Sequence, residues 1–155
     1  MTPGLLDELY RAHGHAVMRR ARRILRNDED ARDVVQDVFL ELYRNPAQFE
    51  QRSSIATYLY AAATHTCLNR IRDGKNRTRL LAIERRESSS SGGSEHRTLA
   101  CEILSRLSDE EAALAVYLYC DELTHDEVAR LLGCSRRHVG DLAKALRKRI
   151  EERVA

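Results

Sequence analysis

The sequence contains no tryptophan, only two prolines and only seven glycines among its 155 residues. Proline and glycine interrupt helices, so their scarcity, together with abundant alanine, leucine, arginine and glutamate, is typical of an all-α protein. No apolar run approaches the length of a membrane span, and the N-terminus lacks the pattern of a signal peptide. We therefore expect a cytoplasmic protein without membrane insertion.

The four cysteines include no Cys-x-x-Cys pair, and we expect reduced thiols in a cytoplasmic chain. Cys120 with His125 and Cys134 with His138 have loosely zinc-like spacings. Cys134, however, lies in a predicted turn and His138 on an outward helix face, so we expect no metal site. The sequence also shows no nucleophile–base pair and no phosphate-binding glycine loop. We expect neither a cofactor nor catalytic residues, and the protein is not predicted to be an enzyme.

Charge is distributed in blocks, although the net charge is only +2. Residues 11–26 carry six basic and no acidic groups, and residues 27–41 carry six acidic groups and one basic group. Residues 108–127 carry seven acidic and no basic groups. Such blocks indicate separate faces for separate partners, or else solvated helix surfaces.

Near the C-terminus, "THDEVARLLGCSRRHVGDLAKAL" predicts two helices joined by a tight turn. Thr124 and Glu127 have the spacing of a capping box at the start of the first helix. Gly133 follows that helix, where a left-handed residue costs little without a Cβ. The turn is about three residues long, so the helices must cross sharply. The small side chain of Ala129 suits such a crossing, and the segment is predicted to be a helix-turn-helix.

The second helix of this motif directs a polar face away from its apolar residues. Residues 132–155 carry seven basic and three acidic groups, a local charge of +4. Arginines at the start of the second helix are where this motif meets base edges and phosphates. DNA is thus the expected partner, and the alternative is a helical hairpin that only packs. The outward residues are Arg136, Arg137, His138, Gly140, Asp141, Lys144 and Lys148.

A serine- and glycine-rich stretch, "ERRESSSSGGSEHR" at residues 84–97, interrupts the helical pattern and is predicted to be a flexible linker. It divides residues 1–83 from residues 98–155. The fold class that we expect is therefore all-α, with two small helical domains joined by a flexible linker and a helix-turn-helix in the C-terminal one.

Apolar periodicity predicts three or four helices in the N-terminal domain, of which three can be bounded. The first ends at Asn27, the second runs from about residue 29 to 44, and the third from about 54 to 72. The second helix has an apolar inward face and an acidic outward face. Its predicted inward residues are Ala31, Val34, Val35, Val38, Phe39 and Leu42.

These segments together are similar to a known family. "NDEDARDVVQDVFLELYR", the helix that ends "CLNRIRDGKNR", the short linker and the helix-turn-helix resemble a bacterial RNA polymerase sigma factor of the extracytoplasmic-function (ECF) type. The resemblance covers nearly the whole chain and includes the pattern D-A-x-D-x-x-Q-x-x-F. The chain departs from the family by carrying tyrosine at Tyr58, histidine at His65 and asparagine at Asn69, where tryptophan, asparagine and aspartate are usual.

The resemblance implies three binding surfaces and their partners. The acidic helix would bind core RNA polymerase through Asp30, Asp33, Gln36, Asp37 and Glu41. The loop and third helix would capture the melted −10 strand of promoter DNA through Phe49, Tyr58, Thr64, His65, Asn69, Arg70, Arg72, Lys75 and Arg77. The outward residues of the helix-turn-helix would bind the −35 element: Arg136, Arg137, His138, Gly140, Asp141, Lys144 and Lys148. The resemblance also implies a monomer when free, with an anti-sigma factor as a further partner.

Two other functions are compatible with the same residues. One is a stand-alone helix-turn-helix regulator, which should dimerise on paired half-sites, although the sequence offers no dedicated dimerisation helix. The other is a sigma-derived antagonist that binds polymerase without opening DNA.

Overall fold

The computed structural model describes residues 1–49, 53–84 and 102–154, with the backbone alone for 75–84 and 153–154. Within these ranges the regular structure is helical and includes no strand, as the sequence predicts. The chain divides into two compact units, Met1–Arg70 and Ile71–Ala155. No helix in the described ranges is long and apolar enough to cross a membrane.

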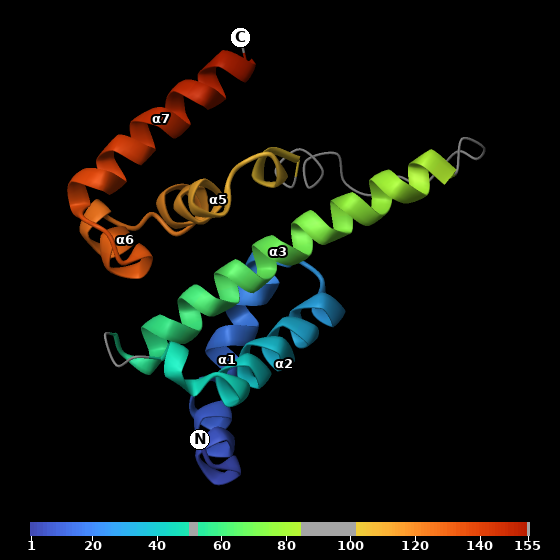
Figure 1. The fold of residues 1–155 in the computed structure, drawn as a ribbon, viewed down its shortest axis with the longest axis vertical. Coiled ribbons are helices and arrows are strands. Elements are labelled where there is room, and N and C mark those ends of the chain that lie inside the picture. Colours follow the sequence, from blue (N-terminus) through green and yellow to red (C-terminus); the bar gives the residue numbers. More distant parts are fainter. Residues whose placement is uncertain (50–52, 85–101, 155) are drawn as a thin grey trace. The chain divides into compact units, whose positions relative to one another are not determined.

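The first unit contains α1 (Pro3–Leu25), α2 (Asp28–Arg44) and the first part of α3 (Ile55–Glu84) (Figure 1). Thr2 caps α1 by accepting a hydrogen bond from the Leu5 amide. Asn27 caps α2 in the same way through the Asp30 amide. The predicted break at Asn27 and the predicted second helix are confirmed.

Apolar side chains from all three helices form the core of the first unit. Every inward residue predicted for α2 is at most 5% exposed, which confirms the apolar periodicity of this helix. Burying side chains of this size stabilises the fold by about 1.5–3 kcal/mol each. The buried apolar residues of the unit are Val17, Ala21, Leu25, Ala31, Val34, Val35, Val38, Phe39, Leu42, Leu59, Ala63, Cys67 and Leu68.

The third helix is longer than the sequence predicts. It was expected to end near Arg72, but α3 continues to Glu84. Gly74 lies within this helix, although glycine costs about 1 kcal/mol relative to alanine in a helix interior. The predicted linker, residues 84–97, lies outside the described residues except for Glu84, the last residue of α3.

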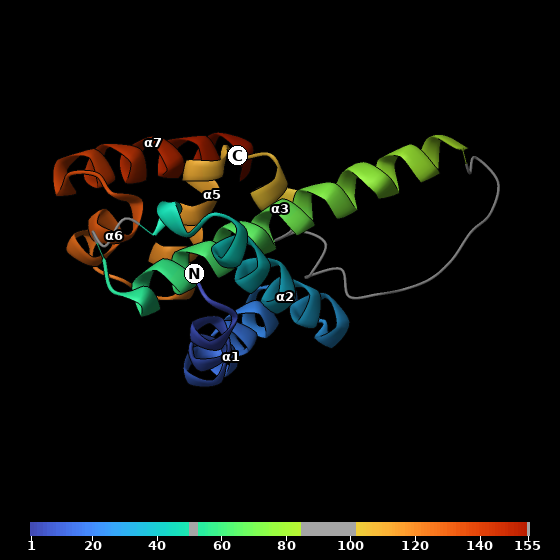
Figure 2. The same ribbon diagram turned by 60° about the horizontal axis from the view of Figure 1, so that its bottom comes forward.

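The second unit contains α5 (Asp109–Ala115), a π-helical segment (Val116–Cys120), α6 (His125–Leu132) and α7 (Arg136–Val154) (Figure 2). Ser108 with Glu111 forms a capping box at the start of α5, and Thr124 with Glu127 forms another at the start of α6. The predicted capping box on α6 is thus confirmed.

The turn between α6 and α7 has the predicted conformation. Gly133 is left-handed, with φ at 66°, and ends α6. Ser135 then accepts a hydrogen bond from the His138 amide at 3.1 Å and caps α7. The buried apolar residues of the second unit are Leu107, Ala112, Ala113, Leu114, Val116, Tyr117, Val128, Ala129, Val139 and Leu146.

Candidate functional site

The outward face of α2 is strongly acidic. Its first turn contains three acidic residues, a favourable place because the amide end of a helix attracts negative charge. Asp33, Gln36, Asp37 and Glu41 are exposed and Asp30 is half-buried. Glu41 accepts a hydrogen bond from the Asn45 side-chain amide at 2.7 Å. The five residues predicted to bind polymerase therefore lie along one helix, with their polar groups in reach of solvent.

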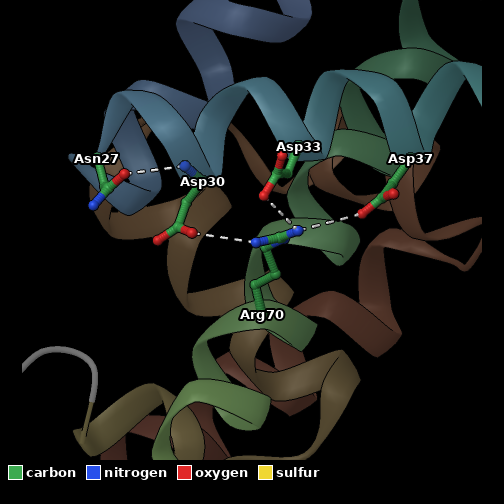
Figure 3. A network of polar contacts seen from close by, with 5 residues as sticks. All are labelled: Asn27, Asp30, Asp33, Asp37 and Arg70. Carbon is green, nitrogen blue, oxygen red and sulfur yellow. Dashed lines mark hydrogen bonds and ion pairs between the residues drawn. The ribbon is translucent and has the colours of Figure 1, made fainter.

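Arg70 of α3 lies against this acidic face, as Figure 3 shows. Its guanidinium donates to Asp30 and to Asp33, each at 3.2 Å, and Asp37 lies 3.7 Å away. The resemblance to sigma factors implies that Arg70 contacts the −10 strand and that the three aspartates contact polymerase. In the structure, Arg70 from the predicted −10 surface therefore contacts three aspartates of the predicted polymerase surface.

Phe49, which follows a short 3-10 helix (Pro46–Gln48), forms an aromatic pair with Tyr58 in the first turn of α3. Their ring centroids are 5.5 Å apart and the rings meet edge to face. Both side chains are half-buried. Burial, with a smaller contribution from the Glu41 carboxylate, raises the pKa of the Tyr58 phenol. The phenol is therefore protonated at neutral pH, and the pair offers ring surface on which an unpaired base could stack.

Thr64 lies in the core of the first unit, unlike the neighbouring residues predicted to contact DNA. Its side chain is 0% exposed. The hydroxyl accepts from the Arg20 guanidinium at 3.1 Å and donates to the Tyr60 carbonyl at 2.9 Å. The Arg20 guanidinium also lies 4.3 Å from the centroid of the Tyr60 ring. Thr64 is thus positioned to support α3 from inside, not to contact a strand at its surface.

Sequence reasoning missed Arg20, which is only 6% exposed. The charge pattern predicts that the basic block at residues 11–26 lies on the protein surface. A signal was present, because Arg20 follows Val17 by three residues and so shares the inward face of α1. This arginine holds α1 to α3 through the hydroxyl of Thr64 and the ring of Tyr60.

The remaining residues predicted to bind the −10 strand occupy different environments. His65 is half-buried, and burial lowers its pKa, so it is neutral at pH 7. Asn69 is exposed. Arg72, in the second unit, donates to the Leu107 carbonyl at 2.9 Å and pairs with Asp109. Lys75 and Arg77 lie in the helical backbone of α3, where side chains are outside the described residues.

Cys67 provides a test of packing in the first unit. It is 0% exposed, and burial raises the pKa of its thiol to about 12, against the opposing effect of the Arg20 and Arg70 charges. Only the thiolate reacts with alkylating agents. At pH 8 we expect iodoacetamide to modify exposed Cys120 while leaving Cys67 intact until the chain is unfolded. Peptide mass spectrometry measures this, and equal modification of both cysteines in the native protein would contradict the packing.

The outward face of α7 matches the sequence prediction in its exposure. Arg136, Arg137, His138, Asp141, Lys144 and Lys148 are all exposed, and Gly140 has open space where a Cβ would lie. Two of these side chains contact acids of neighbouring helices. Arg136 lies 3.7 Å from Asp126, and His138 Nε2 lies 3.4 Å from the Glu110 carboxylate. His138 is therefore turned towards α5, which the helical spacing alone did not indicate.

The described residues contain no group of three or more His, Cys, Asp or Glu side chains that could hold a metal ion. Cys120 is exposed, Cys134 is half-buried, and Cys101 lies outside the described residues.

Parts of both units match models of known protein families. The model of Sigma-70 region 2 matches residues 9–78, and a homeodomain-like domain matches residues 106–152. The chain is 28% identical over 143 residues to RNA polymerase sigma factor YlaC of Bacillus subtilis (strain 168), covering 84% of this chain and 80% of that protein. It is also 33% identical over 69 residues to the ECF RNA polymerase sigma factor SigM of Mycobacterium tuberculosis, or 44% of this chain and 35% of that protein.

A solved structure has the same fold. It is the sigma factor RpoE in complex with the anti-sigma factor NepR from Bartonella quintana, with a TM-score of 0.54 and 16% identity over 97% of this chain and 96% of that one. Because a Sigma-70 region 2 and a homeodomain-like domain follow one another in this chain, and YlaC aligns across both, the chain is homologous to RNA polymerase sigma factors, including one of the ECF type.

Proposed function

We propose that this sigma factor binds core RNA polymerase, directs it to a promoter and takes part in opening the DNA strands. The alignment with a curated sigma factor across both domains carries this proposal. The site residues support it physically, because an exposed acidic face suits a basic protein surface, while exposed arginines suit DNA.

Each surface has a proposed partner. Asp30, Asp33, Gln36, Asp37 and Glu41 bind the polymerase. Phe49, Tyr58, His65, Asn69 and the basic residues that follow contact the −10 strand, and the outward face of α7 contacts the −35 element. We place the polymerase and −10 surfaces in a domain of residues 1–83 and the −35 surface in residues 98–155, with a linker of residues 84–97. The chain acts in the cytoplasm as a monomer when free, and an anti-sigma factor is the further partner that we expect.

Reconstitution with core polymerase tests the function directly. We expect the purified chain to co-purify with core enzyme and to support run-off transcription from a promoter selected from a genomic library. Binding without transcription would indicate an antagonist. Failure to bind polymerase, with dimeric binding to paired DNA sites, would indicate a stand-alone regulator.

Alanine substitution of Arg136 or Arg137 tests the DNA face of α7. If either arginine makes a bidentate contact to guanine, its loss should cost ~1–3 kcal/mol and relax preference at one base position. If it touches only phosphate, binding should weaken evenly over all sequences and the salt slope should fall by about 1. Selection from a randomised duplex pool at two salt concentrations measures both quantities.

Arg11→Ala provides the control, because it removes the same charge from α1, where Arg11 pairs with exposed Asp7. If Arg136→Ala and Arg137→Ala bind DNA as the Arg11→Ala variant does, the second helix of the motif does not contact DNA.

A further inference from the structure

Three carboxylates of α2 share a single guanidinium. Asp30, Asp33 and Asp37 follow one another at spacings of three and four residues, which places them on one helix face. Arg70 Nη1 contacts Asp30, and Nη2 contacts both Asp33 and Asp37. Figure 3 shows the guanidinium lying along the row of acids with its two terminal nitrogens directed at them. We call these four residues the aspartate–arginine cluster.

The charges of the cluster are incompletely balanced. Three carboxylates and one guanidinium leave a formal charge of −2 (three negative charges less one positive). The aspartate side chains are 47–56% exposed and that of Arg70 is 33% exposed, so water reaches every pair. Ion pairs in such a setting are weak and exchange readily. The cluster therefore retains attraction for an external cation, and Arg70 is the group that such a cation would displace.

Arg70 cannot serve the acids and a nucleic-acid phosphate equally well at the same time. A phosphate that approached the bound guanidinium would also approach three carboxylates, and like charges repel at these distances. The guanidinium becomes a good phosphate ligand only after the aspartates have acquired other cations. Arg70 lies in α3, the helix to which the −10 surface is assigned, so its release would occur beside that surface.

We infer that Arg70 is an intramolecular counter-ion of the polymerase-binding aspartates, which a basic surface of the polymerase displaces, freeing the guanidinium to bind a phosphate of the −10 strand. This inference rests on the proposed function. Under this inference, the polymerase replaces Arg70 as the partner of the aspartates, and a strand phosphate then replaces the aspartates as the partner of Arg70. We call this two-step replacement the charge exchange.

Polymerase affinity tests the first half of the exchange. We expect Arg70→Gln to bind core polymerase about fivefold more tightly than wild type at low salt, since no guanidinium has to be displaced. Arg70→Lys, which keeps the charge but cannot bridge three acids, should fall between the two. Arg19→Gln removes the same charge from an exposed position of α1 and should leave the affinity within about twofold of wild type.

Binding of a labelled single-stranded oligonucleotide, without polymerase, tests the second half. We expect Asp33→Asn with Asp37→Asn to increase the affinity about tenfold, because Arg70 gains a phosphate as its partner. Asp7→Asn with Glu8→Gln removes the same charge from exposed positions of α1 and should increase the affinity by less than about twofold. Adding Arg70→Gln to the aspartate variant should abolish the gain.

The outcomes separate the inference from the function on which it rests. If wild-type protein does not bind core polymerase, the proposed function fails. If wild type binds but Arg70→Gln and Arg70→Lys bind no more tightly while melting at the wild-type temperature, the counter-ion role is wrong. A loss of melting temperature in both variants with weaker polymerase binding would make Arg70 a structural link between α2 and α3 instead. If both acid-to-amide double variants gain the same oligonucleotide affinity, the gain comes from the change in net charge and not from the release of Arg70.

Discussion

Core RNA polymerase should no longer co-purify with the chain when Asp33 and Asp37 are both replaced by lysine. Each reversed charge places a cation where the polymerase surface is expected to be basic. Loss of a desolvated charged contact costs ~2–5 kcal/mol, and a contact at the rim costs much less. A loss of ~2 kcal/mol at one desolvated residue alone weakens binding by about thirtyfold. Affinity measured by fluorescence titration at two ionic strengths gives the effect and its salt dependence.

The helical fold of this variant should be retained, because the buried face of α2 is unchanged and the two lost contacts with Arg70 are partly exposed ion pairs, worth about 0–1 kcal/mol each. Circular dichroism checks that point. The matched control is Asp7→Lys with Glu8→Lys, which makes the same change in charge at exposed positions of α1, outside the predicted polymerase surface. If both double variants weaken binding equally, the attraction depends on overall charge and the acidic face of α2 is not the docking surface.

The second large effect should come from Leu146→Ala in α7. Leu146 is 0% exposed in the core of the second unit. Truncating a buried leucine costs ~2–5 kcal/mol through lost burial and the cavity left behind, a large share of the stability of so small a unit. Hydrogen exchange should show the amides of α6 and α7 opening far more often, and binding of −35 duplex should fall with them.

The same experiment tests whether the two units are independent. Amides of α1 and α2 should keep their protection, because their core is made of residues from the first unit. Arg147→Ala, at the adjacent exposed position, should change stability by no more than about 0.5 kcal/mol. Loss of protection in α1 and α2 to the same extent as in α7 would show that the chain unfolds as one unit, against the proposed division into domains.

The sequence was sufficient for features that depend on neighbouring residues. The pairing of Thr124 with Glu127, the left-handed Gly133 and the apolar positions of α2 are all set within one or two helical turns, and the structure agrees with each. The length of α3 is underestimated, because the sequence predicts an end near Arg72 and the helix continues to Glu84.

Contacts between distant residues could not be derived in this way. Arg70 meets Asp30 across 40 positions, and Arg20 meets Thr64 across 44. Periodicity indicates which face of a helix is inward, but not which residue of another helix lies opposite. The same limit applies to the proposed contacts with polymerase and DNA, which depend on partners whose sequences are not in the chain.

The two capping boxes of the second unit make its stability depend on proton uptake. Hydrogen bonds from the backbone amides of Ser108 and Thr124 are the main cause that lowers the pKa of Glu111 and of Glu127 below the ordinary value of 4.5. A carboxylate whose pKa is lower in the folded state stabilises that state above its unfolded pKa, and the contribution disappears as the pH falls through the folded pKa. Acid therefore removes a carboxylate acceptor from the starts of α5 and α6 together. Below about pH 4.5, the melting temperature of the helix-turn-helix unit should fall with each further step in acidity, and the double variant Glu111→Gln with Glu127→Gln should flatten that decline.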